Sequence, residues 1–129
     1  MKTWICKVAL LPVLLAGLIT STVSAQELAE GVWEGVRTDP SETLPPVGIS
    51  IRVEKAPEGE MSIVVLHVLG SRRATDIEFE DGVLRYSFEV PGRDTSSDCV
   101  LSIQDDASLK GECSGDNGAL FVYSFMPPG

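Results

Sequence analysis

The cysteines are the first residues of this chain whose type and spacing point to a specific chemistry. Cys99 and Cys113 flank a polar, turn-forming stretch, whereas Cys6 lies near the start of the chain. Antiparallel pairing of Ile103 with Leu109 across this turn would set Cys99 directly opposite Cys113. Directly opposed residues meet the Cα separation that a disulfide requires. We therefore predict a cross-strand disulfide between Cys99 and Cys113.

The other reactive residue types form no recognisable catalytic or metal-binding motif. His67 is the only histidine, and a zinc site would need further nitrogen or sulfur ligands. Asp105, Asp106 and Asp116 do not reach the ligand count of a calcium loop, and no serine lies in a Gly-x-Ser-x-Gly motif. We expect no metal, no cofactor and no enzymatic activity, and we place His67 at the wall or mouth of the fold. A pair among the 19 acidic residues is the remaining enzymatic alternative.

A leader precedes the part of the chain that carries these residues. Residues 1–25 begin with basic side chains, continue through an apolar run over 8–19 and end on Val23-Ser24-Ala25. This is the pattern of a secretory signal peptide, and its apolar run is shorter than the roughly 20 residues that span a bilayer as a helix. We therefore expect export to the periplasm or the extracellular space, and a single mature domain over 26–129 without a membrane span. In that compartment an even pair of cysteines favours a disulfide.

The charge of the mature chain excludes some classes of partner. The sequence has 19 acidic and 10 basic residues, and two of the basic ones, Lys2 and Lys7, lie in the leader. Residues 26–129 therefore carry 8 positive against 19 negative charges, a net charge of −11. Such a surface repels nucleic acid and anionic membranes, and it suits a basic protein, a cation or simple solubility.

The elements that must position these residues are short β-strands. From Val47 to Glu54 apolar and polar side chains alternate, which is typical of an antiparallel sheet with one face in water. Asp81-Gly82 predicts a hairpin turn, Thr38–Pro46 and Pro91–Asp98 predict loops, and Gly70–Arg73 is expected to interrupt a strand. The predicted strands cover 31–37, 47–54, 63–68, 76–80, 84–90, 99–103, 109–113 and 119–125.

These strands favour one fold class. Eight short strands joined mostly by hairpins, without a convincing helix, are typical of an up-and-down antiparallel β-barrel. Pairing of the first strand with the last would remove the exposed edges of an open sheet. The predicted fold is therefore an all-β barrel of about eight strands that carries one hairpin disulfide.

Short motifs in these strands resemble a known class of barrels. They are Gly31-x-Trp33, Trp33-Glu34-Gly35, Glu80-Asp81-Gly82-Val83-Leu84 and Leu109-Lys110-Gly111. These motifs resemble small lipocalin-like, or calycin-type, β-barrel domains of exported bacterial proteins. The resemblance implies that Trp33 packs across the closed end of the barrel.

The barrel interior is the first candidate binding site. Six aromatic and aliphatic side chains are expected to face inward and to leave room for a small apolar ligand, which would enter past the loops at 38–46 and 91–98. In the alternative interpretation the same side chains simply fill the interior. The six residues are Trp33, Ile49, Ile51, Val65, Tyr86 and Phe88.

The outer face of the strand at 63–68 is the second candidate. Val64, Leu66 and Val68 are expected to form an exposed apolar patch, and such patches usually mark contacts. The patch predicts a homodimer or a protein partner, such as a basic lysozyme or a protease that the domain inhibits.

Basic residues in the predicted loops are a smaller signal. Arg72, Arg73 and Arg93 either hold an anionic head group or are simply solvated charges. Together these observations predict a non-catalytic binding module, for a small apolar ligand or, alternatively, for a protein partner.

Overall fold

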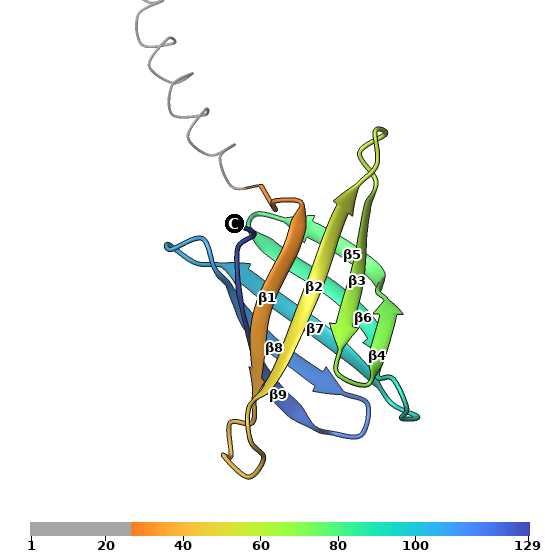
Figure 1. Ribbon diagram of the computed structural model, residues 1–129, viewed down its shortest axis with the longest axis vertical. Helices are drawn as coiled ribbons and strands as arrows, with labels where there is room; N and C mark the ends of the chain where they lie inside the picture. The colour runs from red at the N-terminus through yellow and green to blue at the C-terminus, as the bar shows by residue number, and fades with distance from the viewer. Residues whose placement is uncertain (1–26) are drawn as a thin grey trace, which may run out of the picture.

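The structure is a computed structural model that describes residues 27–129, and it is built of antiparallel β-strands (Figure 1). The predicted leader, residues 1–25, lies outside the described residues. No helix in residues 27–129 has the length and apolar character needed to cross a membrane. The nine strands are β1 Gly31–Thr38, β2 Val47–Lys55, β3 Met61–His67, β4 Gly70–Arg73, β5 Thr75–Glu80, β6 Val83–Glu89, β7 Ser96–Ile103, β8 Leu109–Gly115 and β9 Leu120–Met126.

The strands form one sheet that curls into a nearly closed barrel. Their order is β4-β3-β2-β1-β9-β8-β7-β6-β5, so the first long strand pairs with the last, as predicted. In this pairing Gly35 lies opposite Phe125 and Arg37 lies opposite Tyr123. Between β4 and β5 the chain has a single residue, Ala74, and it passes there from the side of β3 to the side of β6. The all-β barrel predicted from the sequence is confirmed, with nine strands in place of about eight.

The prediction that Gly70–Arg73 only interrupts a strand was wrong. These residues form β4, which pairs with β3 and sets Arg72 opposite Val65. All four residues are exposed, so the pairing rests on the backbone alone and leaves no alternation of apolar and polar residues to detect. The strand before it also ends one residue earlier than predicted, because Val68 and Leu69 form the turn between β3 and β4.

The predicted loop at 91–98 is shorter in the structure. β7 already begins at Ser96, and its first residues pair with the end of β6, with Asp98 opposite Ser87. The Ser87 hydroxyl donates a hydrogen bond of 2.6 Å to the Asp98 carboxylate. Polar residues therefore start this strand because a side-chain hydrogen bond on the outer face accompanies the backbone pairing.

Inward-facing residues follow the predicted period of two and form one core. Trp33 and Gly35 point inward from β1, and Trp33 is only 2% exposed. Its indole Nε1 donates a hydrogen bond of 3.0 Å to the Ala29 carbonyl oxygen, while Leu28 packs into the same core. Gly35 has no room for a side chain, since a Cβ atom there would lie 2.2 Å from the Ser124 carbonyl oxygen. We call the end of the barrel that holds Leu28 and Trp33 the closed end.

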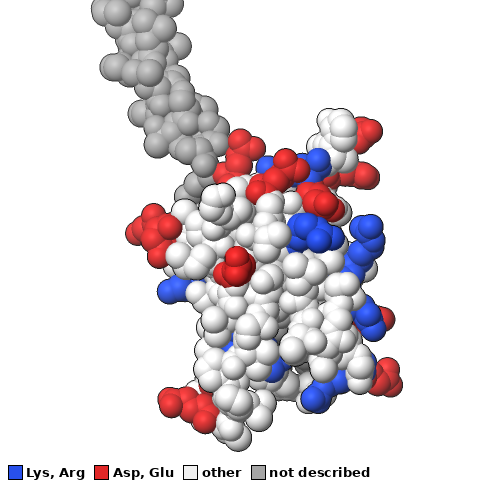
Figure 2. All heavy atoms as spheres, viewed as in Figure 1, with Lys and Arg blue, Asp and Glu red and all other residues white. Residues whose placement is uncertain are grey.

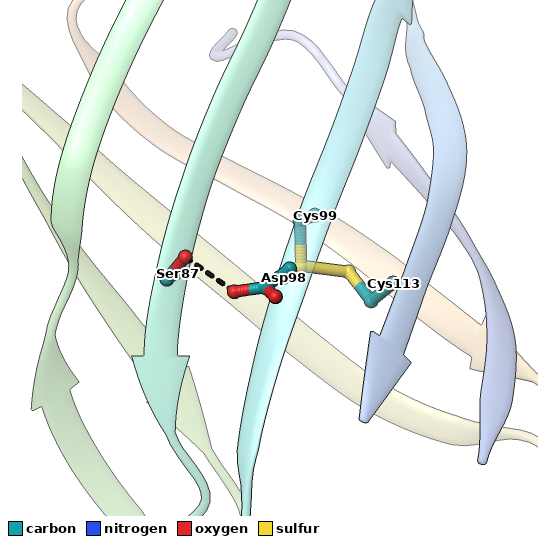
Figure 3. The surroundings of a disulfide bond; sticks show 4 residues. All are labelled: Ser87, Asp98, Cys99 and Cys113. Atoms are coloured by element: carbon teal, nitrogen blue, oxygen red, sulfur yellow. Dashed lines mark hydrogen bonds between the residues drawn. A yellow bond between two sulfur atoms is a disulfide. The ribbon is translucent and has the colours of Figure 1, made fainter. Parts of the chain in front are cut away.

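The disulfide forms in the predicted register (Figure 3). On β7 and β8, Ile103 lies opposite Leu109, Leu101 opposite Gly111 and Cys99 opposite Cys113. The two cysteine Cα atoms are 4.0 Å apart, which is the close spacing of a non-hydrogen-bonded antiparallel pair. Both cysteines point into the core and are 1% exposed.

Charged residues are spread unevenly over the surface. In Figure 2 acidic side chains gather at the closed end of the barrel, and uncharged atoms cover much of the middle of the face shown. The two surface ion pairs within residues 27–129 join Arg52 to Glu54 and Arg85 to Glu78, each at 3.7 Å. Exposed pairs of this kind contribute about 0–1 kcal/mol to stability, so the core and the disulfide hold the barrel together.

Candidate functional site

A cavity of about 410 Å³ opens at the end of the barrel opposite Trp33. Its walls come from strand ends, and its rim comes from the β1–β2, β3–β4, β6–β7 and β8–β9 connections. The volume falls within the roughly 300–1,000 Å³ of small-molecule sites. We call this the open end.

Apolar and aromatic side chains form most of the cavity wall. Phe88 comes from the end of β6, and Val90 follows this strand directly. Val47 comes from the start of β2, and Phe121 and Tyr123 come from β9. The phenol of Tyr123 is largely buried, and burial raises its pKa, although the neighbouring Arg37 partly offsets this rise. Tyr123 therefore stays a neutral hydroxyl in the cavity at physiological pH.

The rim of the cavity is unusually apolar for a set of surface loops. Val68 and Leu69 form the two-residue turn between β3 and β4, and they are 73% and 56% exposed. Leu44, in the β1–β2 loop, is 50% exposed and lines the same cavity. Turns normally carry Gly, Pro, Asn, Asp or Ser, and clustered exposed apolar side chains usually mark a contact.

Two arginines bring positive charge to this apolar site. Arg37 is the last inward-facing residue of β1, and its Cζ atom lies 4.5 Å from the centroid of the Phe121 ring. Arg93 reaches the cavity from the β6–β7 loop. No aspartate or glutamate lines the cavity, and within residues 27–129 neither arginine belongs to an ion pair.

His67 is the third basic side chain at the open end, beside Arg37 and Arg93. It points inward from the last position of β3, as Val65 does, and it lines the cavity. Its Nδ1 atom accepts a hydrogen bond of 3.1 Å from the Leu69 backbone N–H, while its Nε2 atom is buried and has no partner among the described residues. Burial, and then the charges of Arg37 and Arg93, lower the pKa of His67 below its usual 6.5. The neutral ring therefore carries its proton on Nε2.

The six residues predicted to line a ligand site all lie in the core. Each is at most 3% exposed, and Phe88 is the one that lines the cavity at the open end. Trp33 lies at the closed end beside a shallow hollow near Gln104, and the Tyr86 hydroxyl is buried without a partner among the described residues, which raises its pKa far above the usual range. Side chains thus fill the middle of the barrel, and the open space is at one end. The remaining residues of this set, which pack in the middle, are Ile49, Ile51 and Val65.

The predicted interaction surface is divided in the structure. Val64 and Leu66 lie on the outer face of β3 and are partly buried there. Arg73 lies opposite Val64 on β4, and Ser50 lies opposite Leu66 on β2. Val68 is separate from them, because it belongs to the turn at the rim of the cavity. Of the arginines predicted in loops, Arg93 lines the cavity, whereas Arg72 and Arg73 belong to the exposed strand β4.

Sequence reasoning missed several residues of the open end. Arg37 shares the inward parity of Trp33 and Gly35, so the period of two could have placed it in the barrel. Pairing of the first strand with the last would then have set it beside Tyr123. Phe121 follows from the same parity on β9, but the exposed Leu44 and Leu69 carry no such signal.

Among residues 27–129, no group of three or more His, Cys, Asp or Glu side chains is placed to hold a metal ion. The arrangement at the open end instead combines an apolar wall, an apolar rim and three basic side chains. Fold and site together define a small antiparallel β-barrel with a cavity at one open end. No protein-family model, curated protein or solved structure matches this chain.

Proposed function

We propose that this protein is an exported, non-catalytic binding module that takes a small apolar ligand into the open end of its barrel. The observation that carries the proposal is the cavity of about 410 Å³, whose wall is mostly apolar and whose rim exposes Leu44, Val68 and Leu69 to water. Removing apolar surface from water is favourable by about 25 cal/mol per Å². A cavity with an apolar wall and an apolar rim therefore supports a function in which a ligand covers this surface.

The position of the cavity supports the same proposal. The core below it is filled by side chains, and the Cys99–Cys113 disulfide joins two strands of its wall. A preformed site on rigid strands loses less conformational freedom on binding than a flexible one. The loops at the rim then serve as the entrance, as the sequence predicted for 38–46 and 91–98.

Filling the cavity should abolish binding. Ala119 lines the cavity directly before β9 begins at Leu120, and it is only partly buried. In Ala119→Trp the indole would occupy the space of the ligand, so we expect the affinity for the uncharged fluorescent probe N-phenyl-1-naphthylamine to fall about tenfold or more. Titration of the probe by fluorescence measures this affinity, and circular dichroism confirms that the variant is folded.

Val100→Trp is the matched control, because it adds the same indole outside the barrel. Val100 is 42% exposed on the outer face of β7. This variant should bind the probe as the unchanged protein does. A second filling variant, Thr95→Trp, places the indole in the β6–β7 loop at the cavity. If the unchanged protein does not bind the probe, or if all three variants bind it equally, the proposed function is wrong.

A further inference from the structure

We propose that the ligand is an amphipathic anion, whose apolar body fills the cavity and whose single carboxylate is bound at the mouth by Arg37, Arg93 and His67. This inference rests on the proposed function and specifies the chemistry of its ligand. Three observations carry it, namely the absence of acids from the cavity lining, the surroundings of Arg37 and the free donor of His67.

Two acids at the open end are held in their loops by hydrogen bonds, and no acidic side chain lines the cavity. Asp39 accepts hydrogen bonds within its own loop, from the Ser41 backbone N–H and hydroxyl and from the Leu44 backbone N–H. Asp116 accepts hydrogen bonds of 3.3 Å from the Ser96 backbone and hydroxyl. Neither acid lines the cavity. These two carboxylates therefore organise the loops, and within residues 27–129 neither Arg37 nor Arg93 forms an ion pair with an acidic side chain.

Arg37 is placed so that it would gain from an anionic ligand. It is partly buried and packs over the Phe121 ring, with 4.5 Å between Cζ and the ring centroid. A guanidinium that has lost part of its water needs compensation from a charge or from hydrogen bonds. Its planar fork can donate two parallel hydrogen bonds to a carboxylate. Stacking on the ring holds the guanidinium at the cavity edge, where it also lies beside the Tyr123 hydroxyl.

His67 supplies a neutral donor beside the two guanidinium groups. The hydrogen bond from the Leu69 N–H to Nδ1 assigns the proton of the neutral ring to Nε2. Nε2 is buried without a partner among the described residues, and an unsatisfied buried donor is costly. Nε2 is shielded from water, so the imidazole ring would turn slightly to donate this hydrogen bond to a carboxylate oxygen in the mouth.

The charge at the cavity is positive, whereas the net charge of the whole molecule is negative. Residues 27–129 carry 8 positive and 19 negative charges, which would attract a cationic amphiphile in general. The cavity lining has the opposite character, because its charged side chains are basic. A preference for an anionic ligand would therefore arise from the side chains of the cavity and not from the net charge of the protein.

The test compares three ligands that share a ten-carbon chain, namely decanoate, 1-decanol and decylammonium. Each displaces N-phenyl-1-naphthylamine from the full mature chain at pH 7.5, below its micelle concentration. We expect decanoate to bind about tenfold or more tightly than 1-decanol, because hydrogen bonds to charged groups are the strong ones, and decylammonium to bind most weakly. Equal affinities for decanoate and 1-decanol would overturn the proposal and leave the proposed function standing, because the neutral probe still binds.

Arg37→Met tests the main contact while it keeps an unbranched apolar stem over Phe121. We expect it to lose about tenfold or more in affinity for decanoate and nothing for 1-decanol. Arg85→Met is the control with the same change of net charge, since Arg85 is exposed on the outer face of β6. Arg93→Gln should also weaken the binding of decanoate and leave the binding of 1-decanol unchanged. Because Arg93 lies in an exposed loop, this variant does not depend on how well β1 tolerates a substitution. If neither Arg37→Met nor Arg93→Gln weakens decanoate binding, the proposal is wrong.

The pH dependence of decanoate binding tests the role of His67. In the free protein burial and the charges of Arg37 and Arg93 keep the pKa of His67 below 6.5, and a bound carboxylate would raise that pKa. Binding then takes up a proton, so the affinity should increase as the pH falls from 8 to 6, while the carboxylate stays ionised. His67→Gln should remove this increase, whereas Arg85→Met should keep it. An affinity for decanoate that does not change with pH in the unchanged protein would contradict protonation of His67 on binding.

Discussion

Trp33→Ala is expected to lower the free energy of unfolding by about 3–5 kcal/mol and to leave binding at the open end largely unchanged. Trp33 is 2% exposed at the closed end, and its indole donates to the Ala29 carbonyl oxygen. The substitution would leave a large void beside Leu28 and a carbonyl without its donor. Chemical denaturation with urea, followed by circular dichroism, measures the change.

Trp33→Phe separates the two contributions of this side chain. It keeps an aromatic ring in the core but removes the Nε1 donor, so we expect a smaller loss, which includes about 1 kcal/mol for the hydrogen bond. Titration of N-phenyl-1-naphthylamine gives the second readout for both variants. If Trp33→Ala abolished probe binding and left the stability intact, Trp33 would belong to the ligand site and the open end would not.

The alternation of apolar and polar residues predicted most of this fold. A strand with one face in the core must carry an apolar side chain at every second position. The hairpin of β7 and β8 is an example. The predicted pair of Ile103 with Leu109 was enough to place the disulfide correctly. The turn at Asp81-Gly82 was predictable for a different reason. Both residues have positive φ, 54° and 76°, as the tight turn of a two-residue hairpin requires.

Other features depend on tertiary structure that no local pattern reports. All four residues of β4 are exposed, so nothing in Gly70–Arg73 distinguishes a paired strand from a loop. The position of the cavity depends on how the core side chains fill the interior, and Tyr86 and Ile51 fill its middle while the wall beside Phe88 stays open. The likeness to lipocalins, the secretory leader and export remain predictions.

Replacement of both cysteines, in Cys99→Ala with Cys113→Ala, is expected to lower the free energy of unfolding by about 3 kcal/mol. The cysteines are 14 residues apart, and without the bond the unfolded chain regains the freedom of that loop. Small domains have only about 5–15 kcal/mol of net stability, so this loss is a large fraction of the total. Urea denaturation of the double variant, and of the unchanged protein with and without a reducing agent, measures it.

The barrel should nevertheless keep its fold, because other contacts hold the same hairpin in register. Gly111 lies opposite Leu101 so closely that a Cβ atom there would sit 1.9 Å from the Val100 carbonyl oxygen. A strand shifted by one residue would bring a larger side chain to this position and turn the core face outward. Ser87→Ala is the local control, because it removes the neighbouring hydrogen bond to Asp98 on the outer face (Figure 3) and should cost far less. Equal losses in the two variants would contradict the assignment of this stability to the disulfide.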